Sequence, residues 1–252
     1  MKQKIVNLIR RKLGITHINK RIERLECELR FMTSDRWNHW LWVNKTERMD
    51  ATLDIFDEKR RNFHLDRYQF ATKHVTGKRV LDCACGTGYG AELLMKAGAG
   101  SVIGIDIDEE AIGYAEKKHS LKPDGAYIIA SATSTGLDPE SVDVICSFET
   151  LEHLDDESGL LSEFARILVP GGLLIISTPN QWPLAIAPYH VREYDYDSFV
   201  GCAGSQFEVI RVYSQNSGSD GGFNRNQQKG IAEVTNSSRD TAECFIGVFQ
   251  KI

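Results

Sequence analysis

The sequence predicts an α/β domain in which a mostly parallel sheet carries helices on both faces and ends in an antiparallel β-hairpin. From residue 78 onward, short apolar runs alternate with segments of helical spacing, which is typical of right-handed βαβ units. Two β-rich runs then follow at 207–214 and 242–250. The first 50 residues lack this alternation, so we expect a helical extension over 1–50 and the domain over 51–252.

Each element of the domain follows from its local pattern. The apolar runs expected to form parallel strands are 78–85, 101–107, 126–130, 141–148 and 173–178. The helices expected between them are 88–98, 109–120 and 158–168, the last closed by a Pro-Gly-Gly turn at 170–172. The segment 216–238 is rich in Gly, Asn and Ser and predicts a long loop.

Composition excludes several classes of protein. A chain of 252 residues with 42% hydrophobic and 26% charged residues can bury the core of one such domain. The net charge of −5 argues against a nucleic-acid partner, since phosphates require a basic face. No run approaches 18 apolar residues, and the basic start lacks the features of a signal peptide. The six cysteines are therefore expected to be reduced thiols in the cytoplasm.

The N-terminal extension carries an apolar stripe. Ile18, Ile22, Leu25, Leu29 and Met32 follow a 4,3,4,3 spacing, which places them along one side of a helix. A helix packed on its own domain is the first interpretation, and a homodimer through this helix is the second. The basic segment 1–14 is expected to be a solvated helix end, with peripheral membrane contact as the alternative.

The segment 80–90, VLDCACGTGYG, joins the first expected strand to the first helix. Its glycines permit a tight turn and close approach of a ligand, and the helix that follows offers free N–H groups. The spacing is neither the G-x-G-x-x-G of dinucleotide sites nor the G-K-[ST] of a P-loop. Asp106, at the end of the second strand, is placed to accept hydrogen bonds from ribose hydroxyls. These features predict a ribose-bearing cofactor without phosphates, such as S-adenosylmethionine.

Four segments in order, 80–90, 102–108, 141–154 and 165–180, resemble the motifs of the class I S-adenosylmethionine-dependent methyltransferases. The resemblance covers 64–252 and implies a Rossmann-like, seven-stranded sheet. Two positions depart from the family pattern: Ala84 stands where a glycine is usual, and Ser131 with Ala132 where an acid often recognises adenine. The cofactor contacts that the resemblance implies are Arg67, Tyr68, Asp82, Ala84, Gly86, Gly88, Asp106, Ile107, Ser131, Ala132, Ser147 and Phe148.

Candidate catalytic residues follow the fourth and fifth strands. His153 is expected to act as a general base on an acceptor hydroxyl or to order its loop, with Glu149 and Glu152 orienting it or contacting the cofactor. His190, after the fifth strand, is the other candidate base. Arg67 is expected to meet the cofactor's carboxylate or to form a surface salt bridge.

No metal site is predicted. Cys83 and Cys85 lack the second close pair that a structural metal site requires, so they are interpreted as packing residues. Asp155 and Asp156 make a divalent cation conceivable, but acids at a helix start more often interact with the helix dipole.

The predicted function is S-adenosylmethionine-dependent O-methylation of a sugar or glycan precursor. Segments 64–71, 177–183, 190–194 and 214–218 resemble methyltransferases of bacterial surface-polysaccharide biosynthesis. O-methylation of a phenolic or quinone-type small molecule is the alternative within enzymes. A non-catalytic cofactor-binding or scaffolding protein is the alternative of another class, and the glycine spacing disfavours an NAD-linked dehydrogenase.

Overall fold

The computed structural model describes residues 15–45, 48–181, 183–186, 189–217 and 230–252. The chain divides into two compact units, 1–49 and 50–252. Across the described helices, no stretch combines the length and the apolar character that crossing a membrane requires. The predicted alternatives for 1–14, including membrane contact, lie outside the described residues.

The described part of the N-terminal unit forms the helices α2 (Ile15–Ser34) and α3 (Arg36–Val43). Asp35 separates them and caps α3 by accepting a hydrogen bond from the backbone N–H of Asn38 at 2.8 Å. The expected helix around the apolar stripe is confirmed. Four members of the stripe are about half exposed, namely Ile18, Ile22, Leu25 and Leu29.

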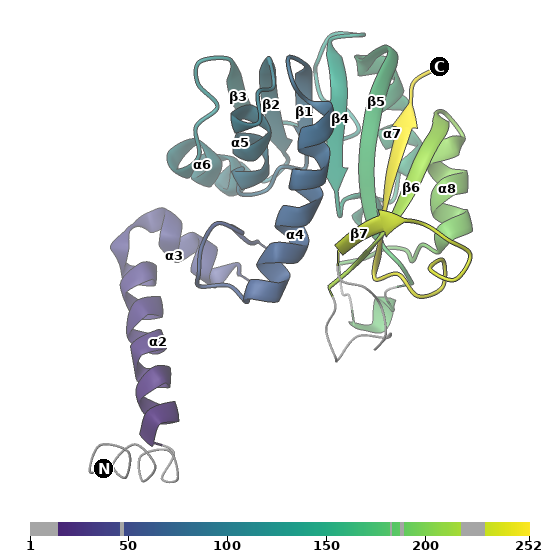
Figure 1. Cartoon of the computed structure of the whole chain (residues 1–252). Coiled ribbons are helices and arrows are strands. Elements are labelled where there is room, and N and C mark those ends of the chain that lie inside the picture. The colour runs from purple at the N-terminus through teal and green to yellow at the C-terminus, as the bar shows by residue number, and fades with distance from the viewer. Residues whose placement is uncertain (1–14, 46–47, 182, 187–188, 218–229) are drawn as a thin grey trace. The chain divides into compact units, whose positions relative to one another are not determined.

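The described residues of the second unit form one sheet of eight strands in the order β3-β2-β1-β4-β5-β8-β6-β7 (Figure 1). The first five strands pair in parallel and the last three are antiparallel, with β8 inserted between β5 and β6. The strands are β1 (Arg79–Cys83), β2 (Ser101–Asp106), β3 (Gly125–Ile129), β4 (Val142–Phe148), β5 (Leu168–Pro179), β6 (Glu208–Asn216), β7 (Gly230–Glu233) and β8 (Cys244–Gln250).

Helices cover both faces of the sheet (Figure 1). The helix α5 packs on β1 and β2, α6 on β2 and β3, α7 on β5, and α8 on β6 and β8. They are α4 (Glu58–Ala71), α5 (Tyr89–Lys96), α6 (Glu109–Lys118), α7 (Glu157–Ile167) and α8 (Tyr196–Gly204), with short 3₁₀ turns η1 (Thr72–His74), η2 (Leu151–His153) and η3 (Leu184–Ile186). Phe164, Phe199 and Phe245 anchor a core that is fully buried.

The expected fold class is confirmed, with two local differences. The sheet has an eighth strand, because β7 pairs with β6 inside the segment expected to be a loop. This edge strand is short and half exposed, so it has no apolar alternation that could reveal it. The strand β5 also begins five residues early, at Leu168, because the Pro-Gly-Gly turn continues as strand through a register shift opposite Val142.

The strand order of the described sheet reverses beside β1, and we call the carboxyl edge at this reversal the crevice. From β1 the chain moves outward through β2 and β3, and it then returns to place β4 on the other side of β1. Ligands of open α/β sheets bind at such a reversal of strand order. The loops after β1, β2 and β4 therefore surround the expected cofactor site.

Candidate cofactor and active site

The loop after β1 has the backbone of a ligand-binding turn. Ala84, Gly86 and Gly88 all have positive φ, of 61°, 53° and 82°. Ala84 thus takes a left-handed conformation that favours glycine, which explains why glycine is usual at its position. No described atom lies within 4 Å of the place where a Cβ on Gly86 would be, so this face is open to a ligand.

The next two glycines of the loop serve packing inside the protein. A Cβ on Gly88 would lie 2.5 Å from the Cβ of Ala115 and 2.8 Å from the hydroxyl of Tyr127. A Cβ on Gly90 would lie 1.9 Å from Cζ of Tyr68. At these two positions the missing Cβ makes room for side chains of the protein itself, whereas at Gly86 it leaves space for a ligand at the crevice.

Asp106 ties the first two loops together. Its carboxylate accepts hydrogen bonds from the backbone N–H of Gly86 at 2.8 Å and of Asp108 at 3.0 Å. A carboxylate oxygen can accept more than one hydrogen bond, so a carboxylate at this place suits ribose hydroxyls. Ile107 follows with 74% of its surface exposed, an apolar side chain in water beside the crevice. The residues present therefore fit a ribose and an adenine.

A buried acid lies beneath this loop. The hydroxyl of Tyr68, from α4, lies 3.2 and 3.3 Å from the two carboxylate oxygens of Asp82. Burial, together with the charge of Asp106, raises the pKa of Asp82 to about 7, against the effect of this hydrogen bond. The ring of Tyr68 packs edge-to-face on the rings of Tyr89 and Phe148, with distances of 5.4 and 5.0 Å between the ring centroids. Tyr68 is thus fixed between the glycine loop and the end of β4.

The remaining predicted cofactor contacts lie in the loop after β3 and in β4. Ser131, after β3, shares a hydrogen bond of 3.0 Å with the hydroxyl of Thr133 and accepts one from its backbone N–H. Ala132 packs against the core. The hydroxyl of Ser147, in β4, is buried and has no hydrogen-bond partner among the described residues.

The cysteines of the loop are packing residues, as expected. Cys83 and Cys85 are 0% and 3% exposed, and burial raises the pKa of both thiols. Asp156 caps α7 by accepting a hydrogen bond from the N–H of Gly159 at 2.8 Å.

Arg67 occupies the inner wall of the site. It is 1% exposed, so the expected surface salt bridge is wrong. Its Nε donates to Oε1 of Gln215 at 2.8 Å, and one terminal nitrogen lies 3.3 Å from the carboxylate of Glu149. Glu149 also accepts from the hydroxyl of Ser177 at 2.9 Å. Sequence reasoning missed Gln215 and Ser177, and their polar character within buried strands was the available signal.

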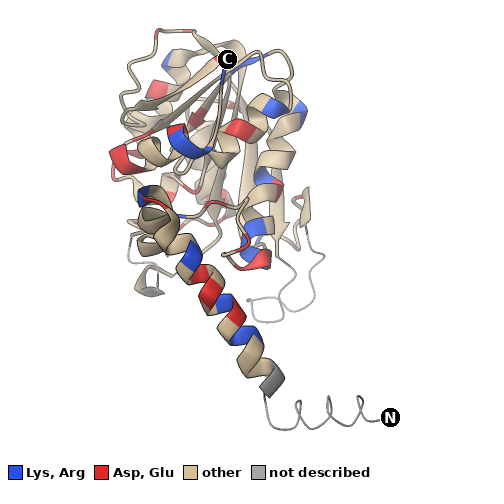
Figure 2. Cartoon of the chain, turned by 90° about the vertical axis from the view of Figure 1, so that its left-hand side faces the viewer, with Lys and Arg blue, Asp and Glu red and all other residues tan. Residues whose placement is uncertain are grey.

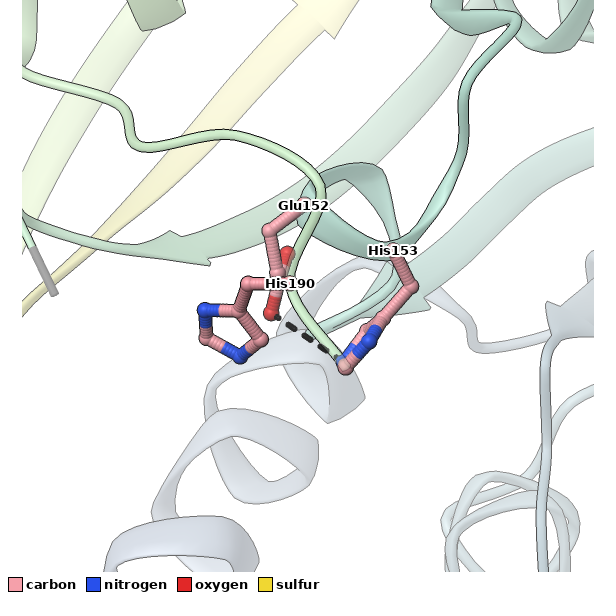
Figure 3. A group of neighbouring side chains, drawn as sticks. All are labelled: Glu152, His153 and His190. Atoms are coloured by element: carbon pink, nitrogen blue, oxygen red, sulfur yellow. Dashed lines mark ion pairs between the residues drawn. The ribbon is translucent and has the colours of Figure 1, made fainter. Parts of the chain in front are cut away.

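The structure brings the two candidate bases together beside Glu152 (Figure 3). The rings of His153 and His190 meet at right angles with centroids 4.8 Å apart. Nε2 of His153 lies 3.9 Å from Oε1 of Glu152, and Nδ1 lies 2.9 Å from the carbonyl of Tyr189. Burial and the charge of Glu149 raise the pKa of Glu152 well above its usual range, whereas burial and His153 lower the pKa of His190.

The strand order and the helices on both faces define a Rossmann-like α/β domain with a ligand crevice at the carboxyl edge of its sheet. Residues 81–176 match the family model described as a methyltransferase domain. The chain is 35% identical over 157 residues to a probable S-adenosylmethionine-dependent methyltransferase of Mycobacterium tuberculosis, covering 60% of this chain and 56% of that protein. It is 40% identical over 112 residues to a ubiquinone biosynthesis O-methyltransferase of Paraburkholderia phymatum, covering 43% of this chain and 47% of that protein.

Solved structures show the same fold. An S-adenosylmethionine-dependent methyltransferase from Mesorhizobium loti superposes with a TM-score of 0.56 at 18% identity, covering 73% of this chain and 98% of that one. A second, from Methanosarcina mazei, superposes with a TM-score of 0.55 at 18% identity, covering 73% and 97%. The chain spans about half the length of the curated relatives it matches. Three of these similar proteins are named as S-adenosylmethionine-dependent methyltransferases.

Proposed function

We propose that the chain is an S-adenosylmethionine-dependent methyltransferase that methylates a hydroxyl group. The observation that carries the proposal is the loop after β1, where the Cβ position of Gly86 faces open space and the N–H of Gly86 is hydrogen-bonded to the carboxylate of Asp106, a group suited to ribose. Ile107 would cover the adenine, and Ser147 supplies a buried hydroxyl without a partner among the described residues. When bound, the cofactor supplies a methyl group activated by a sulfonium.

The protein's own contribution to the reaction is to position the acceptor and accept its proton. His153 and His190 lie next to each other at the carboxyl edge, after the strands that border the crevice. Donation from Nδ1 of His153 to the carbonyl of Tyr189 leaves Nε2 with a lone pair for the proton of a hydroxyl. The lowered pKa of His190 keeps this ring neutral near pH 7, so it too is able to accept a proton.

The acceptor that we favour is the hydroxyl of a sugar or glycan precursor. Beside the histidine pair, Tyr189 is 58% exposed and Glu193 is exposed in the same loop, together with the apolar Val191 at 42%. Such groups suit a polyhydroxylated acceptor, which needs hydrogen bonds and a ring surface. A phenolic acceptor is the second candidate, favoured by the similarity to a ubiquinone biosynthesis O-methyltransferase.

Transfer of a labelled methyl group tests the proposal. We expect a mass gain of one methyl on a sugar nucleotide or lipid-linked sugar, and no transfer to catechols. Replacing the base, in His153→Ala or His190→Ala, should lower kcat by about 10²–10⁴ while cofactor binding persists. His17→Ala, in an exposed part of α2, is the matched control and should leave kcat unchanged. Methylation of catechols alone would favour the second acceptor, and cofactor binding without transfer to any acceptor would favour a non-catalytic protein.

A further inference from the structure

The cluster of Glu152, His153 and His190 has the composition of a metal site. One ligand atom from each residue lies within 4.8 Å of the other two, and the three side chains converge (Figure 3). Two imidazoles and one carboxylate form a donor set that suits divalent transition metals, whereas magnesium and calcium prefer oxygen ligands alone. The residues come from η2 and from the loop after β5, which are remote in sequence.

One carboxylate oxygen of Glu152 is buried and has no hydrogen-bond partner among the described residues. Its side chain is 2% exposed. Its Oε2 accepts a hydrogen bond from the hydroxyl of Thr178 at 3.2 Å, but its Oε1, which faces the histidines, has no hydrogen-bond partner among the residues the structure describes. The guanidinium of Arg67 is ion-paired with Glu149 at 3.3 Å. A buried carboxylate oxygen without a partner is costly, and a cation at this place would satisfy it.

His153 has the hydrogen bond that is typical of a metal-bound histidine. Its Nδ1 donates to the carbonyl of Tyr189 at 2.9 Å, which fixes the tautomer and directs the lone pair of Nε2 toward Glu152. The same loop is held to η2 by the N–H of Val191, which donates to the carbonyl of Glu152 at 2.9 Å. The side chain of Arg192 donates to the carbonyls of Leu154 and Asp155. The position of His190 beside His153 is therefore held by several bonds.

We propose that Glu152, His153 and His190 bind one divalent transition-metal ion of the zinc type. Ligand atoms about 2.1 Å from a shared ion lie at most about 4.2 Å apart, so small side-chain rotations would close the present spacing. Three protein ligands leave a coordination position open. An acceptor hydroxyl bound there would have its pKa lowered and would release its proton to solvent, and the histidines would then hold the ion instead of the proton. Only this role in acceptor activation rests on the proposed function.

Direct metal binding tests the site. All titrations use the full chain with the substitution Cys27→Ser, because the exposed thiol of Cys27 could itself bind a metal ion. The protein is treated with a chelator, the chelator is removed, and the protein is then titrated with Zn²⁺ and with Co²⁺. We expect one ion per chain and a Co²⁺ spectrum without a thiolate charge-transfer band. His153→Ala and His190→Ala should weaken binding by more than about 100-fold, whereas His17→Ala should bind as the parent does. Circular dichroism confirms that each variant is folded.

Absence of stoichiometric binding would overturn the proposal, as would binding that both histidine variants retain. Glu152→Gln keeps the shape of the side chain and removes its charge, so it should also weaken binding, and unchanged affinity would count against the site. If the ion binds as expected and no methyl transfer is found with any acceptor, the site stands and the proposed function falls.

Discussion

The glycine loop allows a sharp prediction, because a side chain on Gly90 would collide with Tyr68, whereas a side chain on Gly86 would face open space. In Gly90→Ala the new Cβ would lie 1.9 Å from Cζ and 2.1 Å from Cε1 of Tyr68. The ring of Tyr68 is closely bounded by Tyr89 and Phe148 and tied to Asp82, so it cannot move aside freely. A normal contact requires about 3.5 Å, so the ring or the helix must shift by about 1.5 Å.

The expected loss of stability follows from two opposing terms. Overpacking a buried site costs about 1–3 kcal/mol, and a displacement of this size at a confined ring corresponds to the upper end, about 3 kcal/mol. Gly90 lies within α5, where alanine improves helix propensity by about 1 kcal/mol. The net loss is about 2 kcal/mol, which lowers the Tm of a domain of this size by about 4–8 °C.

Gly86→Ala is the matched control. Its Cβ would meet no described atom within 4 Å, so the cost is the left-handed φ of 53°, about 1 kcal/mol. We expect Gly86→Ala to lose more cofactor affinity than stability, because its methyl group projects into the crevice. Differential scanning fluorimetry and calorimetric titration of the cofactor measure both quantities. Equal stability of Gly90→Ala and the parent would refute the packing argument, and full cofactor affinity in Gly86→Ala would refute the assignment of the crevice.

Three further predictions concern other parts of the second unit. His119 lies 2.8 Å from Asp50 and 3.1 Å from Glu92, and these carboxylates raise its pKa. Its stabilising contribution is therefore complete below the unfolded-state pKa of about 6.5 and is lost as pH rises through the folded-state pKa. In thermal melts, the loss of Tm in His119→Gln should shrink at alkaline pH, and a loss that is constant with pH would contradict this. Ala84→Gly should raise stability by about 1 kcal/mol in chemical denaturation by relieving the left-handed φ, and a loss would contradict the strain. Ile107→Ser should weaken cofactor binding about fivefold through loss of apolar burial while leaving Tm unchanged, and an unaltered Kd would place the adenine elsewhere.

The sequence predicted those parts of the fold that a local pattern encodes. The inner parallel strands β1, β2 and β4 carry continuous apolar runs because most of their residues are buried, and Asp106 was recognisable from its place at the end of such a run. The edge strand β7 could not be recognised, since hydrogen bonds to β6 rather than apolar burial hold it in the sheet. The local pattern of apolar residues thus predicts which segments are buried better than it predicts which strands pair with each other.

The site was predicted in part. His153 and His190 were both expected at the carboxyl edge, but their contact with each other depends on how the loop after β5 folds back onto η2. The burial of Arg67 depends likewise on Gln215, which lies 148 residues further along the chain. A polar residue within a buried strand signals an internal partner, but no periodic pattern indicates which distant residue that partner is.

Calorimetric titration with S-adenosylmethionine and its demethylated product tests the central claim most directly. We predict binding of one cofactor per chain, and an affinity at least about tenfold weaker in Asp106→Ala, which loses a charged acceptor for the hydrogen bonds of the ribose hydroxyls. Asp106→Asn, which preserves the shape of the side chain, should bind with intermediate affinity. Absence of binding by the unaltered protein, or equal affinity in a folded Asp106→Ala, would contradict the account.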